Sequence, residues 1–394
     1  ARFVILANGI LTTPKLARID GMETFQGDSF HTSRWDYNID LKGKRVGIIG
    51  TGATAVQAVP ELAKTVGELF VFQRTPSSID VRDQRETTDE ERRTWATEPD
   101  WAKKRRARFA RIAEGRTALK ANDDYLAGKV DDYKERKAHA GKLTQEELVQ
   151  KQLDTNFRIM EQIRARVDAI VQDPETAEAL KPYYPYGCKR PTFHDEYLPA
   201  FNLPHVHLVD VSKETITIRP KGIEVAGHVH EVDAIVYATG FDAMTGALLQ
   251  VDIEGRDGKR LADHWADGPR TYLGLAMSGF PNLFTVTGPQ SPSVFTNMIA
   301  SIEQHCEWIT DCITTLRDQG KTVIEAEEPA EDAWVEHNRE VGAAHLRSSS
   351  ASWYTGENIA GKPVGFMPYI GGLPQYTEKC EEVAAKGYEG FRIA

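Results

Sequence analysis

A glycine-rich turn with the spacing of a phosphate-binding loop is present at Gly50-Thr51-Gly52-Ala53-Thr54-Ala55. It follows an apolar run, Lys44–Gly50, that is typical of a buried strand, and it opens a stretch of helix-forming residues, Ala53–Lys64. Glycines in such a turn let a pyrophosphate approach the backbone, and the helix N-terminus offers unpaired N–H groups. The pattern predicts a dinucleotide site, with an ordinary strand-to-helix turn as the alternative. The residues predicted to contact the dinucleotide here are Gly50, Thr51, Gly52, Ala53, Thr54 and Gln57.

The end of the next strand decides which dinucleotide this turn would hold. NAD-binding folds place an acidic residue there for the ribose hydroxyl, whereas NADP-binding folds place a cation for the 2′-phosphate. This chain has Arg74 and Thr75 directly after the apolar run Leu69–Phe72. A guanidinium can donate two parallel hydrogen bonds to a phosphate, and a threonine hydroxyl can add another. The sequence therefore favours NADPH. The alternative is that Arg74 is only a solvated surface charge.

A second spacing pattern, Phe25-x-Gly27-x-x-x-His31-x-x-x-Trp35, precedes the strand before the glycine turn. The chain holds only 11 His and 7 Trp residues, so this spacing is difficult to obtain by chance. A histidine that merely packs beside aromatic residues is the alternative interpretation. The pattern resembles the fingerprint of the type I Baeyer–Villiger monooxygenases, flavoproteins that use FAD, NADPH and O₂ to insert oxygen beside a ketone carbonyl. Trp35 argues against N- or S-oxygenating flavin monooxygenases, which usually share only the Phe, Gly and His part.

Later segments resemble the same family in the same order. Val236–Asp242 resembles the crossing segment, in which the chain of these flavoproteins returns from the NADP domain to the FAD domain. The resemblance implies that Thr239 and Gly240 contact the cofactor. Asn8-Gly9 resembles the earlier crossing. Gly288–Met298 resembles the loop and helix start beside the flavin and the substrate, which implies Met298 as a further cofactor contact. The resemblance places the wall of the substrate pocket at Ser293, Val294 and Phe295.

The resemblance also implies the catalytic residues. Lys189 and Arg190, in a loop of Tyr, Pro and Gly residues, match a functional pair in which the lysine joins the 2′-phosphate site and the arginine is catalytic. Oxygen transfer to a ketone develops negative charge on oxygen, which a guanidinium can stabilise in a dry pocket; on sequence alone, a surface arginine is the alternative. Ser352–Pro363 resembles a mobile C-terminal lid, with Trp353 reaching the nicotinamide. His31, Arg190 and Trp353 are therefore the predicted catalytic residues.

These residues require a fold that brings strand ends together. Strand, helix and strand over Lys44–Phe72 form one βαβ unit. The segment 83–182 is rich in charged and helix-forming residues, and Leu143–Ile170 has apolar positions at helical spacing, which predicts a helical insertion with solvated faces. Strand character then returns, so we expect an interrupted sheet to resume. The further predicted elements are the strands Phe3–Ala7, Val206–Val209, Ile216–Ile218 and Ile235–Ala238 and the helix Asn297–Arg317.

The expected fold class is α/β, in the two-dinucleotide-binding-domain architecture of these flavoproteins, with a helical insertion in the NADP domain. Residues 1–38 are expected to end the first part of the FAD domain and form a linker, and 39–82 and 183–236 to form the NADP-binding Rossmann domain. Residues 83–182 are the expected helical insertion, and 237–394 the C-terminal part of the FAD domain with its lid.

Composition excludes several other classes of function. Of the 394 residues, 58 are Asp or Glu and 48 are Lys or Arg, and the net charge of −10 disfavours nucleic acid as a partner. No apolar run is long enough to span a membrane or resembles a signal peptide, so a soluble cytoplasmic protein is expected. Cys188, Cys306, Cys312 and Cys380 have no metal-ligand spacing and are expected to be packed thiols, without a metal site. The expected partners are a small-molecule ketone and O₂.

One part of the family pattern is absent from this sequence. The family has a first glycine loop, which holds the FAD pyrophosphate, whereas the turn at Gly50 is the NADP loop by its order relative to His31. The chain begins with Ala1, inside an apolar run, and is expected to lack the first half of the FAD domain. We therefore expect little FAD affinity and no monooxygenation by this chain alone. A non-catalytic NADP-binding fragment is thus an alternative of another class.

Overall fold

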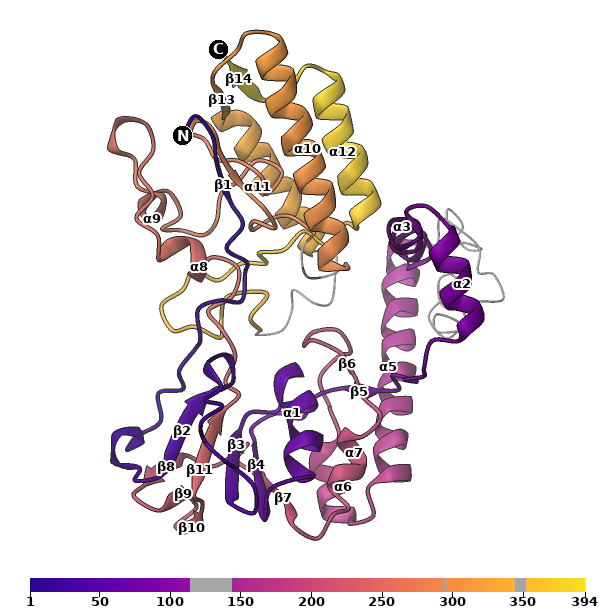
Figure 1. Cartoon of the computed structure of the whole chain (residues 1–394), viewed down its shortest axis with the longest axis vertical. Coiled ribbons are helices and arrows are strands. Elements are labelled where there is room, and N and C mark those ends of the chain that lie inside the picture. The colour runs from indigo at the N-terminus through magenta and orange to yellow at the C-terminus, as the bar shows by residue number, and fades with distance from the viewer. Residues whose placement is uncertain (114–143, 293, 295, 344–351) are drawn as a thin grey trace. The chain divides into compact units, whose positions relative to one another are not determined.

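The computed structural model describes residues 1–113, 144–292, 294, 296–343 and 352–394, drawn in colour in Figure 1. They form two compact units. Unit 1 comprises the described parts of Ala1–Thr13, Glu86–Leu143 and Asp242–Ala394. Unit 2 comprises Pro14–Arg85 and Thr144–Phe241. Each unit is therefore assembled from segments that are far apart in the sequence.

A parallel sheet forms the centre of unit 2, with strand order β2-β11-β3-β4-β7 (Figure 1). All four neighbouring pairs are parallel, which places the carboxyl ends of the strands at one edge. The helix α1 (Ala53–Ala63) joins β3 to β4, so the predicted βαβ unit is confirmed. The strands are β2 (Asp28–His31), β3 (Arg45–Ile49), β4 (Glu68–Gln73), β7 (Val206–Asp210) and β11 (Ala234–Tyr237).

Both faces of this sheet are covered, as is usual for parallel sheets. Val46, Ile48 and Val236 pack on one face into a core that includes residues of α1 and of the helices α5 (Gln145–Ile170), α6 (Pro174–Leu180) and α7 (Tyr197–Ala200). Ile49 and Ile235 pack on the other face against an antiparallel sheet. That sheet has the order β10-β9-β8 and consists of β8 (Ile216–Arg219), β9 (Gly222–Val225) and β10 (His228–Glu231).

Two strands differ from the sequence prediction. The predicted strand Ile216–Ile218 exists as β8, but it does not extend the parallel sheet. Only two residues separate β8 from β9, and so short a connection requires an antiparallel pair. The strand β2 was not predicted, because Asp28–His31 is short and half polar. It takes the edge of the sheet beside β11, where its apolar residue Phe30 is buried.

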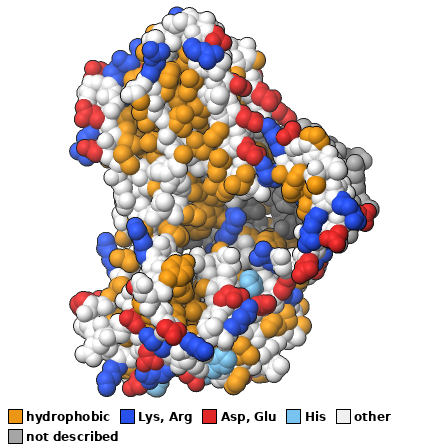
Figure 2. Space-filling view, viewed as in Figure 1, with side chains coloured by type: hydrophobic (Ala, Val, Ile, Leu, Met, Phe, Trp, Pro, Cys, Tyr) orange, Lys and Arg blue, Asp and Glu red, His pale blue; other side chains and the backbone are white. Residues whose placement is uncertain are grey.

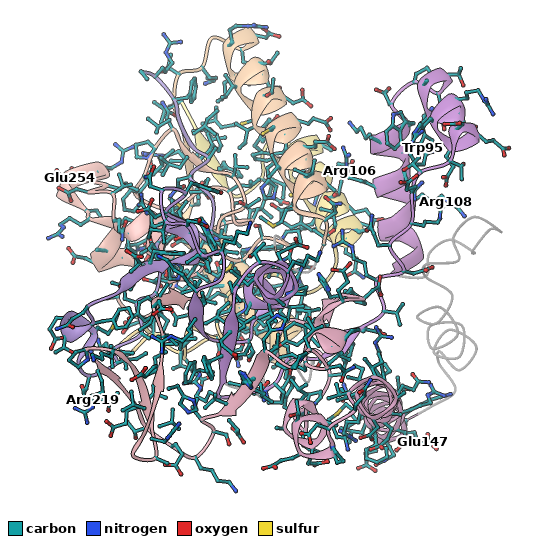
Figure 3. The ribbon with its side chains drawn as sticks, turned by 60° about the horizontal axis from the view of Figure 1, so that its bottom comes forward. Trp95, Arg106, Arg108, Glu147, Arg219 and Glu254 are labelled. Atoms are coloured by element: carbon teal, nitrogen blue, oxygen red, sulfur yellow. The ribbon has the colours of Figure 1, made fainter. Side chains whose placement is uncertain are left out.

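The described part of the predicted insertion 83–182 is mainly helical, with irregular segments such as 83–88, and residues 114–143 lie outside the described residues. Its helices α2 (Asp89–Thr97) and α3 (Trp101–Ala113) belong to unit 1, whereas α5 and α6 belong to unit 2. Arg106 extends from α3 toward the helix α10 (Met298–Asp318) and forms an ion pair with Glu303 (Figure 3). The pair Lys103–Glu307 joins the same helices. Some of the charged side chains that were predicted to be solvated thus form ion pairs that join α3 to α10 within unit 1.

The core of unit 1 forms around α10, whose predicted span of Asn297–Arg317 is confirmed to within one residue. It packs with the helices α11 (Glu328–Ala343) and α12 (Leu373–Ala385) through residues that include Trp308, Trp334 and Tyr376. The predicted opening strand is β1 (Val4–Leu6), which pairs in parallel with β12 (Leu283–Thr285). The remaining pair, β13 (Ile324–Ala326) and β14 (Phe391–Ile393), is antiparallel.

Shorter elements complete the described part of the chain. The strands β5 (Ile79–Asp80) and β6 (Thr192–Phe193) form a parallel pair in unit 2. The short helices are α8 (Gly246–Leu249) and α9 (Leu261–His264), and the 3-10 turns are η1 (Met22–Thr24), η2 (Thr32–Arg34) and η4 (Arg256–Gly258).

Acidic and basic side chains are interspersed on the face shown in Figure 2, rather than separated by sign. None of the helices within the described ranges combines the length and apolar character that crossing a bilayer requires. Across the same ranges, no three His, Cys, Asp or Glu side chains are grouped so as to hold a metal ion. The cysteines are free thiols, and Cys188, Cys312 and Cys380 are buried as expected. The expectation of packing is wrong for Cys306, which lies on the exposed side of α10.

Candidate functional site

The glycine turn lies at the carboxyl end of β3, with β4 and β11 on either side. The Gly50 N–H donates to the Phe72 carbonyl at 3.0 Å, and the Ala238 N–H donates to the Ile49 carbonyl at 2.9 Å. Gly50 has φ +108°, and a Cβ atom there would lie 2.5 Å from the Ala238 carbonyl oxygen. Only glycine therefore fits this position, both by conformation and by space.

The helix α1 begins directly after this turn. Gly52 is its N-cap, and no side chain of the described residues caps the first N–H groups. Gly52, Ala53, Thr54 and Gln57 are exposed, and a Cβ atom built on Gly52 meets nothing within 4 Å. Uncapped N–H groups and the positive end of the helix dipole attract phosphate. The residues present therefore fit a dinucleotide pyrophosphate.

Thr51 ties this turn to the segment after β4. Its side chain is buried, and its Oγ1 donates to the Thr75 carbonyl at 2.7 Å. Ser77 Oγ donates in return to the Thr51 carbonyl at 2.5 Å. Arg74 is exposed, and no carboxylate of the described ranges forms an ion pair with it. The predicted 2′-phosphate residues Arg74 and Thr75 are thus held beside the predicted pyrophosphate site.

The loop that carries Lys189 is tied to the same segment through Tyr184. The Tyr184 hydroxyl donates to the Pro76 carbonyl at 3.0 Å and accepts from the Ser78 N–H at 3.1 Å. Burial raises the pKa of Tyr184, so its hydroxyl keeps its proton at neutral pH. Lys189 Nζ lies 5.6 Å from the centre of the Tyr184 ring. These contacts bring Lys189 to the chain segment that follows Arg74 and Thr75.

Arg190 and Trp353, the other two candidates from the resemblance, belong to different units. Arg190 is exposed at the end of the same loop in unit 2, just before β6. Trp353 is half-buried in unit 1, where its ring lies 4.2 Å from that of Tyr354.

His31 is 4% exposed and lies at the end of β2. The Ser33 N–H donates to its Nδ1 at 3.2 Å, so Nδ1 carries no proton. Its Nε2–H therefore donates to the Gly240 carbonyl, 3.0 Å away. Burial lowers the pKa of His31, and the hydrogen bond to Gly240 opposes this less strongly. A neutral histidine thus fastens the fingerprint to the predicted crossing segment.

The other fingerprint residues fix β2 against the sheet. A Cβ atom on Gly27 would lie 2.4 Å from the Asp233 carbonyl oxygen, so this strand passes the start of β11 at close range. Phe25 packs against the core beneath the antiparallel sheet. Trp35 meets Phe30 edge-on, with ring centres 4.9 Å apart. Each of the four fingerprint residues, Phe25, Gly27, His31 and Trp35, thus has a contact that fixes the edge strand β2 or the residues next to it.

A cluster in unit 1 brings together three predicted residues. Val294 is 5% exposed, and Met298 and Trp353 pack against the buried cluster that contains it. Ser293 and Phe295, predicted for the pocket wall, lie outside the described residues. The structure thus places Val294, Met298 and Trp353 in one apolar cluster.

The predicted lid borders a pocket of about 280 Å³ in unit 1. Lys362 at its end is 9% exposed in its side chain, and its Nζ donates to Asp242 at 2.7 Å and to the Ala243 carbonyl at 2.6 Å. Two contributions were missed from the sequence: the roles of Tyr184 and Lys362. No local sequence pattern indicates the partner of either residue, because each one contacts a segment more than 100 residues away.

Comparison with known proteins shows relatives along the whole chain. No protein-family model matches it. Over the whole chain, 36% of residues are identical to acetone monooxygenase (methyl acetate-forming) from Gordonia sp. strain TY-5, of which 75% is covered. Baeyer–Villiger monooxygenase ATR8 from Stachybotrys chlorohalonatus is 39% identical over the whole chain, which covers 63% of that protein.

Solved structures agree with these relatives. The crystal structure of OTEMO in complex with FAD and NADP superposes with a TM-score of 0.83 and 32% identity. The match covers the whole chain and 76% of the OTEMO chain. The α/β fold of this chain is therefore that of an FAD- and NADP-binding architecture. With the fingerprint residues and the glycine turn in place, the chain belongs to the type I Baeyer–Villiger monooxygenase family.

Proposed function

We propose that this chain supplies the NADPH site and the catalytic arginine of a Baeyer–Villiger monooxygenase, which converts a ketone and O₂ into an ester or lactone. The observation that carries the proposal is the phosphate cradle of unit 2. The uncapped N-terminus of α1 follows Gly50, and Thr51 joins the turn to the segment of Arg74 and Thr75 by a hydrogen bond. Tyr184 brings Lys189 to that segment.

The parts of NADPH are assigned to separate groups of residues. Thr51, Gly52, Ala53 and Thr54 would receive the pyrophosphate through their backbone N–H groups, with Gln57 beside them. Gly50, whose own N–H donates to the Phe72 carbonyl, would let the phosphates approach the backbone. Arg74, Thr75 and Lys189 would hold the 2′-phosphate, which NADH lacks. His31 would act as a positioning residue, because its two ring nitrogens are engaged within unit 2 and one of them holds Gly240, next to Thr239, in place.

Two further roles follow from the family. Arg190 would stabilise negative charge on the oxygen of the ketone adduct, because its guanidinium stays protonated throughout the reaction. The apolar cluster of Val294, Met298 and Trp353, together with Ser293 and Phe295, would form the wall around substrate and cofactor.

FAD supplies the oxygen-transferring chemistry of this family when it is bound. The printed sequence contains one glycine loop of the required kind, and it is the one assigned to NADPH. The residues present therefore fit NADPH and do not provide a cradle for the FAD pyrophosphate. We expect the polypeptide Ala1–Ala394 to bind NADPH and to lose any added flavin on desalting. A flavin absorption band that persists after desalting would contradict this.

The domain roles are also a proposal. Unit 2 would be the NADP-binding domain, with α5 and α6 as its part of the helical insertion. Unit 1 would be the C-terminal part of the FAD domain, with Ser352–Pro363 as its lid and with α2 and α3 attached to it.

A chimera tests the catalytic part of the proposal. The chain is joined to the quarter of the Gordonia acetone monooxygenase that the match does not cover. The product mixture from ketones, thioethers and amines is then analysed with NADPH and O₂. Ester formation that is lost in Arg190→Ala, while NADPH oxidation persists, supports the proposal. Sulfoxide or N-oxide without ester would favour an N- or S-oxygenating enzyme instead. NADPH binding without turnover of any substrate would favour a binding fragment.

A further inference from the structure

We propose that Lys15 is an additional NADPH-binding residue, which contacts the pyrophosphate from the β11 side of the glycine turn, opposite Arg74. The inference rests on the NADPH site proposed above and assigns a residue outside every sequence pattern that led to that site.

The backbone of Lys15 is fixed at the carboxyl end of β11. Its N–H donates to the Gly240 carbonyl at 2.8 Å, and its carbonyl accepts from Thr239 Oγ1 at 2.5 Å. The neighbouring residue Pro14 forms an antiparallel bridge with Phe241. Lys15 is therefore held at the edge of the sheet where the glycine turn lies.

The glycine turn separates Lys15 from Arg74. Within the sheet, β3 lies between β11 and β4, with Ile49 opposite both Tyr237 and Phe72. Gly50 follows Ile49, and a Cβ atom on it would lie 2.5 Å from the Ala238 carbonyl oxygen, on the β11 side. Arg74 follows β4 on the other side, so one cation flanks the turn from each neighbouring strand.

The charges of these two residues are not balanced by acidic side chains. Across the described ranges, no carboxylate forms an ion pair with Lys15 or Arg74. Two other half-buried lysines of unit 2 are paired with carboxylates, Lys44 with Asp28 and Lys181 with Asp168. Burial lowers the pKa of Lys15, and the nearby charge of Arg74 lowers it further. An ammonium that is partly buried near another cation is stabilised when an anion binds beside it.

The position of Lys15 indicates which phosphate it meets. The predicted 2′-phosphate residues Arg74, Thr75 and Lys189 lie on the β4 side of the turn. The turn and the uncapped N-terminus of α1 follow β3, and this strand lies between β4 and β11. Lys15 would therefore reach the pyrophosphate, which NADPH and NADH share, before it could reach the 2′-phosphate.

The test compares the dissociation constants of NADPH and NADH at one ionic strength. Lys15→Gln is expected to weaken both dinucleotides by a similar factor, about five- to twentyfold, as for the loss of one charge-assisted contact. Lys15→Arg is expected to retain most of the affinity. The matched control is Lys42→Gln, which removes the same charge from an exposed lysine before the amino end of β3.

A second measurement uses the unmodified chain, so that it does not depend on how a variant folds. Amines are acetylated with and without NADPH or inorganic pyrophosphate, and the labelled lysines are identified by mass spectrometry. Both ligands are expected to protect Lys15 and to leave Lys42 equally reactive.

The outcomes separate this inference from the proposed function. If the unmodified chain binds neither dinucleotide, the NADPH site and the role of Lys15 are both wrong. If it binds NADPH but Lys15→Gln leaves both affinities unchanged, or Lys15 is labelled equally with and without ligand, only the role of Lys15 is wrong. Weakening of NADPH alone would also overturn the assignment, because it would place Lys15 at the 2′-phosphate.

Discussion

The ring of His31 donates a hydrogen bond through Nε2 to the carbonyl oxygen of Gly240, which lies 209 residues later in the chain, at 3.0 Å. The contact joins the fingerprint to the crossing segment within unit 2. Because the Ser33 N–H donates to Nδ1, the ring can make both contacts only as the neutral tautomer with its proton on Nε2. A protonated ring would lose the hydrogen bond from the Ser33 N–H, while its Nδ1–H could donate to Ser33 Oγ, 2.8 Å away.

Replacing His31 with Ala is expected to lower the free energy of unfolding by about 2 kcal/mol, because two hydrogen bonds and a packed ring are lost. Urea denaturation measures this change. The control is His228→Ala, which removes an exposed histidine of β10 and should change stability by less than about 0.5 kcal/mol. Equal stability of the two variants would show that the His31–Gly240 contact is not stabilising.

The stability of unit 1 is expected to depend on pH through His305. Its Nδ1 accepts the Thr287 N–H at 2.9 Å, and burial lowers its pKa from 6.5 to about 4. Between these two values the unfolded chain binds one more proton than the folded chain, so the free energy of unfolding falls as the pH falls from 6.5 to 4. The full contribution is on the order of 3 kcal/mol, and it is present above the unfolded-state pKa.

The matched variant for this prediction is His305→Asn, which can still accept from Thr287 but cannot titrate. Its stability should change less steeply with pH over this interval. The remaining slope reports other groups, including His31 and His230, whose pKa values burial also lowers. An unchanged slope in the variant would show that His305 is not the group responsible.

Two glycines of the phosphate turn should respond differently to alanine. Gly50→Ala forces a Cβ atom to within 2.5 Å of a carbonyl oxygen at φ +108°, and is expected to cost at least about 2 kcal/mol of stability. Gly52→Ala has φ −71° and open space around its Cβ, so the fold should tolerate it. The added methyl group should nevertheless weaken NADPH, because it occupies the approach to the helix N-terminus. Thermal unfolding and NADPH titration of both variants separate the two roles.

Arg74→Ala should weaken NADPH by about ten- to a hundredfold and leave NADH nearly unchanged, because only NADPH carries the 2′-phosphate. Fluorescence titration with each dinucleotide measures the difference. The control is Arg82→Ala, which removes an exposed arginine of the same unit. If Arg74→Ala lowered the affinities for NADPH and NADH by the same factor, the assignment of Arg74 to the 2′-phosphate would be wrong.

Asp242→Asn should loosen the end of the predicted lid, because it removes the carboxylate that neutralises the nearly buried Lys362. The expected loss is about 2 kcal/mol in the free energy of unfolding, with faster hydrogen exchange over residues 352–363. Asp267→Asn, an exposed acidic position in unit 1, serves as the control. Unaltered exchange in Asp242→Asn would show that this ion pair does not hold the segment.

Much of the local structure could be predicted from the sequence. The apolar run before Gly50, the glycines and the following helix formers specify a strand, a tight turn and a helix through neighbouring residues alone, and β3 and α1 confirm them. The span of α10 was also predictable, because Asn297 is a strong N-cap whose side chain accepts from the Ile299 N–H.

Interactions between distant segments could not be read from local patterns. Ile216–Ile218 has the same strand character whether it joins the parallel or the antiparallel sheet, and the short connection to β9 decides between them. The Phe-Gly-His-Trp spacing was recognised by resemblance, but its physical cause is the edge strand β2 and the carbonyl of Gly240.

The sequence by itself determined the residue types that phosphate binding requires and the local turn that presents them. Only the tertiary structure showed that Tyr184 brings the Lys189 loop to the Arg74 segment, and that Lys15 flanks the glycine turn. Local conformation depends on neighbours along the chain, whereas a binding site depends on strand order, which places the carboxyl ends of β11, β3 and β4 side by side.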